Sequence, residues 1–227
     1  MQPGLRICRR ERKVDAAILR LFAGLPVAVV SDNMNRMFAG GATLRPMHRA
    51  GRLLGPAFTV HTRPGDNLFV HKALDLAEPG DVIVVDAGGD LTNAIIGEIM
   101  TSYAAMRGIA GFVINGAIRD SDTIGTGSLP VYAAGVTHRG PYKDGPGEIN
   151  VPVSVGGMTV EPGDLVIGDA DGLLVVPFDQ AETIGRAAVA KHAQEEKTLA
   201  AIARGEGGDR AWVDAALRRL GLSPDGT

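Results

Sequence analysis

The sequence predicts a compact layered α/β domain in which short buried strands and amphipathic helices share a core. Two segments, "VIVVD" and "LVIGD", each follow a Pro-Gly-Asp turn, which is typical of buried strands entered through tight turns. Segments with helical spacing lie between strands, and 31 glycines, 13 prolines and 4% aromatic residues favour many turns over a helical bundle. Because strands and helices do not alternate strictly, layers are expected rather than a doubly wound sheet.

Composition and charge exclude several classes of function. The chain has 227 residues, 45% of them apolar, and a net charge of −3, so no overall basic field favours nucleic acid as a partner. The basic run Arg6–Lys13 is expected to be a solvated arm or a first helical turn. The longest apolar run contains Pro26 and is too short to span a bilayer, which argues against a membrane partner. The single cysteine, Cys8, excludes an intramolecular disulfide and fits a reduced, cytoplasmic protein.

The first half of the chain predicts two helices and two strands. Residues 14–25 have apolar residues at helical spacing and reach a glycine stop at Gly24. The next segment, "PVAVV", reads as a short buried strand leading into a polar turn. Residues 51–62 are rich in β-forming residues between Gly and Pro, and residues 66–80 open with the capping residue Asp66 and stop at Pro-Gly.

The second half predicts further strands and helices. Residues 93–108 form a helix that ends at Gly108 and starts at either Asn93 or Gly97. The strand "IAGFVIN" follows, and then short strands in "LPVYAAGV" and "VPVSVGG". Residues 179–205 form a long helix, and 209–221 a short amphipathic one. One face of the 93–108 helix is predicted to consist of Ile95, Ile96, Ile99, Met100, Tyr103 and Met106.

The segment from Asp86 to Asp122 carries the candidate site. It reads as strand, glycine-rich acidic loop, helix and strand, followed by Arg119 and Asp120. If the two strands are parallel neighbours, their carboxyl ends meet where ligands bind in open α/β sheets. Backbone N–H groups near Gly97 would then face the same crevice and could hold an anion.

Arg119 and Asp120 suit a small anionic substrate and a metal. An arginine can pair with a carboxylate in bidentate fashion, and an aspartate is a hard oxygen ligand for Mg²⁺ or Mn²⁺. The alternative is a surface ion pair that ends a strand. The histidines lack zinc-site spacing, and His71, in an apolar helix, is expected to be a core or interface residue.

Several blocks of the sequence resemble the RraA-like family. They are "HKALDLAEPGDVIVVDAGGD", "GEIM…RGIAGFVINGAIRD" and "PVSVGGMTVEPGDLVIGDADGLLVVP", and the likeness extends over residues 27–205. The family includes regulators of ribonuclease E activity and aldolases of 4-hydroxy-4-methyl-2-oxoglutarate and 4-carboxy-4-hydroxy-2-oxoadipate. The resemblance implies a three-layer β/β/α swivelling fold and a homotrimer or homohexamer. It gives an N-terminal helical arm at 1–26, an RraA-like core at 27–177, and C-terminal helices at 178–227 that pack at the oligomer interface.

The resemblance also assigns functions to residues. It implies a class II pyruvate aldolase that needs Mg²⁺ or Mn²⁺ and cleaves 4-hydroxy-2-oxo acids. Such an enzyme could also decarboxylate oxaloacetate. The alternative is a non-catalytic, protein-binding regulator of the ribonuclease E type. The segment "EGGDRAWVDAALRRLG" departs from the aldolases and leaves the 2-oxo acid open. The resemblance implies that the substrate is bound by the backbone of Gly97, Glu98, Ile99 and Met100 and is contacted by Arg119. It implies that Asp120 binds the metal. Glu195 of a neighbouring subunit, or else Glu196, would support that metal.

Overall fold

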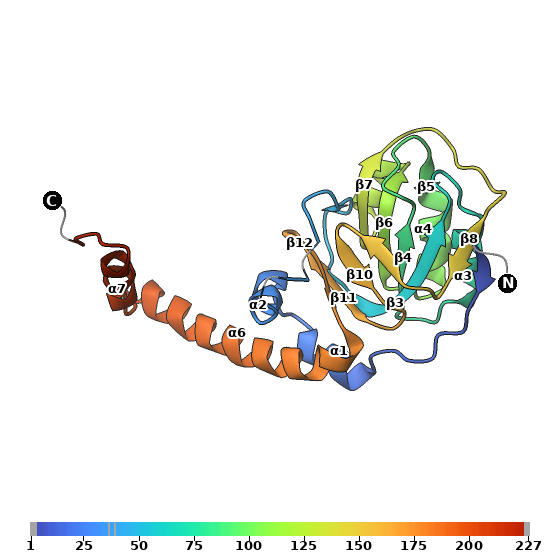
Figure 1. The fold of residues 1–227 in the computed structure, drawn as a ribbon. Helices are drawn as coiled ribbons and strands as arrows, with labels where there is room; N and C mark the ends of the chain where they lie inside the picture. The colour runs from blue at the N-terminus through green and yellow to red at the C-terminus, as the bar shows by residue number, and fades with distance from the viewer. Residues whose placement is uncertain (1–3, 36, 39, 225–227) are drawn as a thin grey trace. The chain divides into compact units, whose positions relative to one another are not determined.

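A computed structural model describes residues 4–35, 37–38 and 40–224 of a chain that falls into two compact units, Met1–Val189 and Ala190–Thr227 (Figure 1). The sequence-based boundaries after residues 26 and 177 stay predictions. The elements, in chain order, are β1 (Leu5–Ile7), α1 (Ala16–Phe22), α2 (Val27–Asp32), β2 (Arg45–Pro46), β3 (Leu53–Thr62), α3 (Leu68–Leu76), β4 (Val82–Asp86), β5 (Ala94–Ile96), α4 (Glu98–Met106), β6 (Gly111–Ile118), α5 (Ser121–Thr126), β7 (Val131–Val136), β8 (Gly147–Ile149), β9 (Val153–Val155), β10 (Met158–Val160), β11 (Leu165–Asp169), β12 (Gly172–Val176), a 3₁₀ turn (Phe178–Gln180), α6 (Ala181–Ala203) and α7 (Ala211–Arg219).

The first unit is built on a mixed sheet with the strand order β1-β8-β3-β4-β6-β7-β2. Strands β3, β4, β6 and β7 are parallel to one another. The ten-residue strand β3 also pairs antiparallel with β8 through its second half and with β11 through its first half. The sheet therefore branches at β3, and the β11–β12 hairpin leaves it there.

Alternate side chains of the central strands pack into two different cores, which gives three layers. Ile83 and Val85 of β4 belong to a cluster with helices α3 and α4, which lie on one face of the sheet (Figure 1). Val82 and Val84 point to the opposite face and pack with residues of β9, β10, β11 and β12. The mixed α/β fold predicted from the sequence is thus confirmed, with helices on one face of the central sheet and strands on the other.

A third apolar cluster covers the outer side of the β11–β12 hairpin and corrects one expected element. The segment expected to be a strand after Pro26 is the helix α2, whose Val27, Val29 and Val30 are buried in this cluster. The N–H of Val27, in the first turn of α2, donates to Asp169 Oδ2 over 2.9 Å. Packing and this capping contact outweigh the β propensity of the valines.

Of the two starts expected for the helix that ends at Gly108, the structure confirms Gly97 and not Asn93, and the helix buries another face than predicted. Residues 94–96 form β5, so Ile95 and Ile96 are buried in a strand, and α4 starts after Gly97. Ile99 and Met106 are 79% and 71% exposed. The buried side of α4 consists of Met100, Thr101 and Ala104. The predicted face was wrong because it included Ile95 and Ile96, which belong to β5 and not to the helix. The glycine stop at Gly108 is confirmed by its φ of +73°.

The basic N-terminal run is not a helical turn, and it is a solvated arm only in part, because most of its residues are exposed but Arg10 is inserted. Its first residues form β1, which pairs with β8 at the edge of the sheet. Arg10 then inserts toward the core, with its side chain 8% exposed, and Arg10 Nη1 lies 2.9 Å from Oδ1 of the fully buried Asp81. Arg6 and Lys13 pair with Glu148 and Glu78. The positive charges of this run are therefore largely paired with acidic side chains.

The Arg10–Asp81 pair leads to a prediction about stability. Replacement of Asp81 by alanine leaves a buried guanidinium with only the more distant Glu78, at 3.7 Å, as its counterion. The free energy of unfolding should fall by about 3–5 kcal/mol, the usual cost of orphaning a buried charge, as measured by urea denaturation. The control is Asp179→Ala, because Asp179 pairs with Arg12 in solvent and should contribute at most about 1 kcal/mol. Equal losses for the two variants would contradict the prediction.

The second unit consists of the end of α6 and the helix α7, and none of its described residues is buried. Its exposed apolar side chains include Leu199, Ile202, Trp212 and Leu220. Helices of this kind owe most of their stability to packing of an apolar face. In the described part of the chain no helix is both long enough and apolar enough to cross a membrane.

Candidate functional site

The candidate site forms where β5, β6 and the start of α4 meet. Strands β4 and β6 are parallel neighbours, with Asp86 opposite Asn115. Strand β5 pairs with the C-terminal end of β6, with Ile96 opposite Ile118. The N–H of Arg119 donates to Ile96 O over 3.0 Å, so the residues after the two strands, Gly97 and Arg119, lie side by side. The structure therefore brings the Arg-Asp pair to the N-terminus of α4.

The backbone of Asp120 turns its carboxylate toward that helix terminus. Asp120 has a φ of +55° and a ψ of +40°, a left-handed conformation that aspartate tolerates better than most residues. It precedes α5, but its side chain forms no capping bond to α5. Instead, Oδ2 of Asp120 accepts the N–H of Glu98, the first residue of α4, over 2.9 Å. The partial positive charge of the α4 N-terminus therefore stabilises this carboxylate.

Arg119 and Asp120 present a paired, accessible charge. Arg119 Nε lies 3.7 Å from Asp120 Oδ2, and the two side chains are 42% and 39% exposed. Both groups thus remain open to a ligand. Gly97 permits this arrangement, because a Cβ on it would lie 2.9 Å from Arg119 Cγ and still closer to Asp120 Oδ2.

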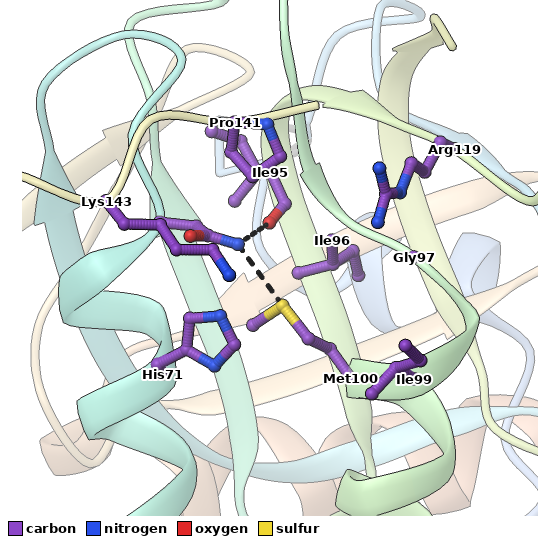
Figure 2. Close-up of a pocket in the computed structure, with 10 residues that line it drawn as sticks. His71, Ile95, Ile96, Gly97, Ile99, Met100, Arg119, Pro141 and Lys143 are labelled. Atoms are coloured by element: carbon purple, nitrogen blue, oxygen red, sulfur yellow. Dashed lines mark hydrogen bonds between the residues drawn. The ribbon is translucent and has the colours of Figure 1, made fainter. Parts of the chain in front are cut away.

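A cavity of about 110 Å³ lies on one side of Arg119, and Figure 2 shows its lining. His71 and Lys143 stand on the wall opposite Arg119 in this view, with Ile96 and Gly97 between them. Helix α3 contributes His71, and the loop after β7 contributes Lys143. The lining residues are Asn67, His71, Ile95, Ile96, Gly97, Ile99, Met100, Arg119, Pro141 and Lys143.

Asn67 lines this cavity and carries an unpaired, buried hydrogen-bond acceptor. Its Nδ2 donates to Ile95 O over 2.9 Å and lies 3.4 Å from Met100 Sδ (Figure 2). Its Oδ1 is buried and has no partner within the described chain. A buried polar atom without a partner is costly unless a water or ligand supplies one. The unpaired Oδ1 is therefore a local cost to stability.

His71 is expected to be uncharged at neutral pH. Burial lowers the pKa of its imidazole below the ordinary value, and the positive charge of Lys143 lowers that pKa further, while Asp75 opposes the shift. The cavity therefore combines two basic side chains, Arg119 and Lys143, with a neutral imidazole. This charge pattern favours an anionic ligand.

A second, open cavity of about 520 Å³ lies on the Asp120 side of the site. Arg119 lines both cavities, so its guanidinium stands between them. The lining residues of the second cavity are Glu98, Arg119, Asp120, Ser121, Asp122, Thr123, Val136, Thr137 and His138.

The predicted substrate-binding segment starts α4, and its residues differ in availability. The N–H of Glu98 is occupied by Asp120, and that of Met100 donates to Gly97 O over 3.1 Å. Ile99 points its side chain into solvent, whereas that of Met100 is buried. Whether this backbone binds substrate stays a prediction.

Glu195 and Glu196 lie in the second unit, which the structure describes by itself. Glu195 Oε1 lies 3.5 Å from Lys191 Nζ, and Glu196 Oε1 lies 3.8 Å from His192 Nε2. These pairs join residues one helical turn apart, which is usual on an exposed helix. The expected role of Glu195 in a neighbouring subunit's site stays a prediction.

The residues present fit one kind of metal site. Among the described residues, no three His, Cys, Asp or Glu side chains come together as a metal cage. The described residues therefore do not provide the three or four protein ligands that zinc needs. Mg²⁺ keeps several waters and commonly takes one or two carboxylates together with substrate oxygens. The accessible carboxylate of Asp120 matches that second pattern.

Sequence reasoning missed Asn67, Lys143 and the place of His71 in a cavity. Asn67 follows the expected helix cap Asp66, so it read as part of a capping turn. Lys143 lies in a loop without a motif. Residues 67, 97, 119 and 143 are separated in the sequence, and only the three-dimensional structure shows that they line one cavity.

Comparison with known proteins gives consistent similarities. A family model described as RraA-like, Aldolase/RraA, matches residues 27–175. A Halalkalibacterium halodurans protein named "Putative 4-hydroxy-4-methyl-2-oxoglutarate aldolase" is 41% identical over 86% of this chain and 93% of its own length. A solved, uncharacterized protein of Pseudomonas syringae pv. tomato has a TM-score of 0.78 at 28% identity, covering 86% of this chain and 96% of that one.

A further solved structure is Streptomyces coelicolor RraAS2, described as an unusual member of the RNase ES inhibitor RraA protein family. Its TM-score is 0.74 at 27% identity, and the match covers 82% of this chain and 96% of that one. The family-matched segment, 27–175, contains Gly97, Arg119 and Asp120, whereas Glu195 lies outside it.

Proposed function

This chain belongs to the RraA-like family, and from that premise we propose that it is a metal-dependent carbon–carbon lyase that cleaves 4-hydroxy-2-oxo acids to pyruvate. The name of the H. halodurans relative supports 4-hydroxy-4-methyl-2-oxoglutarate as a substrate. The single observation that carries the proposal is the placement of an accessible Arg119–Asp120 pair against Gly97 and the N-terminus of α4.

The chemistry of cleavage requires the site to stabilise negative charge on oxygen. The hydroxyl proton at C4 is removed, the C3–C4 bond breaks, and its electron pair passes to the 2-oxo group as an enolate, which is then protonated to pyruvate. The other fragment leaves as a second 2-oxo acid. A fixed cation near the 2-oxo oxygen is favourable, because it stabilises charge that develops only during cleavage. Arg119 would have this role.

Other residues would bind and orient the substrate. The N-terminus of α4 would attract the C1 carboxylate, since the start of a helix carries partial positive charge. Lys143 lines the adjoining cavity and would pair with the carboxylate at the opposite end of the substrate. Asp120 would hold Mg²⁺ or Mn²⁺, which when bound supplies Lewis acidity to the substrate's oxygens. Decarboxylation of oxaloacetate needs the same charge stabilisation, so we include it in the proposal.

We further propose that the enzyme is a homotrimer or homohexamer in which Glu195 reaches the site of a neighbouring subunit. The second unit supports association, because it exposes Leu199, Ile202 and Trp212 and none of its described residues is buried. Glu195 is half-exposed and so accessible to a neighbour. Analytical ultracentrifugation tests the assembly.

The first experiment measures pyruvate release from 4-hydroxy-4-methyl-2-oxoglutarate and from oxaloacetate. Purified protein is stripped with EDTA and assayed without metal and after addition of Mg²⁺ or Mn²⁺. We expect no turnover above background after stripping and recovery on addition of either ion, because one protein carboxylate binds such ions weakly enough to exchange. Full activity in EDTA, or none with any metal, would contradict the proposed function.

A second candidate is a protein-binding regulator, which the description of the S. coelicolor neighbour favours. A regulator of this kind needs a complementary surface and no reaction chemistry. Binding of an RNase E-type ribonuclease by wild type and Asp120→Asn alike, without turnover by either, would favour this candidate over the lyase.

A further inference from the structure

We propose that Asp66 is a positioning residue that fixes two segments of the wall of the cavity beside Arg119, an inference that rests on the proposed function. Asp66 follows β3, precedes α3 and is fully buried. Its neighbour in the chain, Asn67, lines the cavity, and the loop that Asp66 binds carries Lys143, which lines the same cavity. One carboxylate thus joins two backbone segments of the cavity wall.

The hydrogen bonds of Asp66 use both carboxylate oxygens. Oδ1 accepts the N–H of Leu68 over 2.9 Å at the start of α3. Oδ2 accepts the N–H groups of Asp144 and Gly145, each over 2.8 Å, and Arg63 Nη2 over 2.9 Å. Hydrogen bonds to a carboxylate are stronger than neutral ones, and here they fix the residues next to Asn67 and Lys143.

The loop depends on these bonds because it has little packing of its own. Between β7 and β8, residues 138–140 and 142–144 are exposed. The loop is held by backbone bonds to the same segment, from Asn67 N to Tyr142 O over 3.0 Å and from Tyr142 N to Gly65 O over 2.8 Å. Arg63 also lies over the Tyr142 ring at 5.7 Å. A segment with few buried side chains opens readily when such bonds are lost.

Only a carboxylate satisfies this arrangement. An asparagine at position 66 has nearly the same shape but replaces one oxygen with an NH₂ group. In either orientation, that NH₂ faces an N–H donor, at Leu68 or at Asp144 and Gly145. A donor placed against a buried donor loses the bond and adds a penalty. Asp66→Asn should therefore release one segment of the cavity wall without creating a void.

His71 supplies a readout that does not depend on catalysis. Burial is the main cause that lowers the pKa of His71, and the positive charge of Lys143 lowers that pKa further. If the loop moves Lys143 away, the pKa of His71 rises toward its ordinary value, although Asp75 remains on the same helix. NMR titration of the histidines, with the His71 signal assigned through His71→Asn, measures this. Lys143→Ala should reproduce the rise.

The experiment compares Asp66→Asn with Asp164→Asn in the full chain. Asp164 is also buried, and its carboxylate accepts two backbone N–H groups, those of Glu161 and Phe178, over 2.9 and 2.8 Å. It does not line the cavity beside Arg119. For Asp66→Asn we expect the KM for 4-hydroxy-4-methyl-2-oxoglutarate to rise about 10- to 100-fold, with a smaller change in kcat and a raised His71 pKa. Asp164→Asn should lose stability only.

The outcomes separate this inference from the proposed function. An unchanged KM and an unchanged His71 pKa in Asp66→Asn would overturn the positioning role. If wild type turns over no hydroxy-oxo acid, the proposed function fails, and the His71 pKa alone decides whether Asp66 positions the wall. If Asp66→Asn does not fold, Arg63→Leu removes one donor to Asp66 and should give a smaller rise in KM and in the His71 pKa. No rise in either quantity would overturn the proposal.

Discussion

Asp120→Asn should reduce kcat/KM for pyruvate release about 1,000-fold while the protein remains folded. The substitution keeps a residue that tolerates the left-handed backbone at position 120. It removes the negative charge that would hold a divalent cation, and loss of a direct ligand should exceed the 10- to 100-fold effect typical of an outer-shell partner. Steady-state kinetics over a range of Mg²⁺ and Mn²⁺ concentrations measures the loss and shows whether excess metal restores activity.

The matched control for Asp120→Asn is Asp171→Asn. Asp171 is an exposed aspartate in the turn between β11 and β12 and lines neither cavity of the site. Activity and unfolding temperature should both stay near the wild-type values in this variant. A folded Asp120→Asn variant with wild-type turnover would exclude Asp120 as a metal ligand and remove the main support for the lyase.

Gly97→Ala should lower kcat/KM about 100-fold with little change in stability. The φ of Gly97 is −153°, which any residue adopts, so the backbone accepts alanine. The added methyl group would nevertheless collide with Asp120 Oδ2 and would lie 2.9 Å from Arg119 Cγ. Both charged side chains must shift, and displacement of a reacting group by about 1 Å can cost a factor of about 100.

The control for Gly97→Ala is Gly41→Ala. A Cβ at position 41 meets only Gly156 O at 3.5 Å and Thr43 Oγ1 at 4.0 Å, which are ordinary contacts. Steady-state kinetics and thermal unfolding of both variants give the comparison. If Gly97→Ala unfolds at a much lower temperature than Gly41→Ala, the added methyl group destabilises the whole fold and does not act on the site alone. The prediction is then wrong.

Local patterns sufficed for much of the fold. The Pro-Gly-Asp turns identified β4 and β11, and in both turns the aspartate side chain accepts a backbone N–H three residues earlier, from Glu78 and from Glu161. The parallel pairing of β4 and β6, on which the interpretation of the site depended, is also present in the structure. These features depend on neighbours in the chain, which is why a sequence reveals them.

The errors came from long-range contacts. Val27–Asp32 has the composition of a strand, and its helical form depends on packing against the β11–β12 hairpin and on Asp169. Arg10 looked solvated because its partner, Asp81, is far away in the chain. Likewise, no local signal places Lys143 in one cavity with Asn67. The Arg119–Asp120 pair could be proposed beforehand because both residues directly follow one strand, β6.

The branching of the sheet at β3 has a consequence for how the chain folds. Strand β3 is complete at Thr62, but two of its partners, β8 and β11, begin only at Gly147 and Leu165. During synthesis, the backbone N–H and C=O groups of β3 that pair with β8 and β11 therefore stay without these partners until much of the first unit has emerged from the ribosome. Pairings between distant segments form slowly and expose strands to aggregation while they wait. The lifetime of that unpaired strand, more than the strength of any one contact, should set how much chaperone assistance this protein requires.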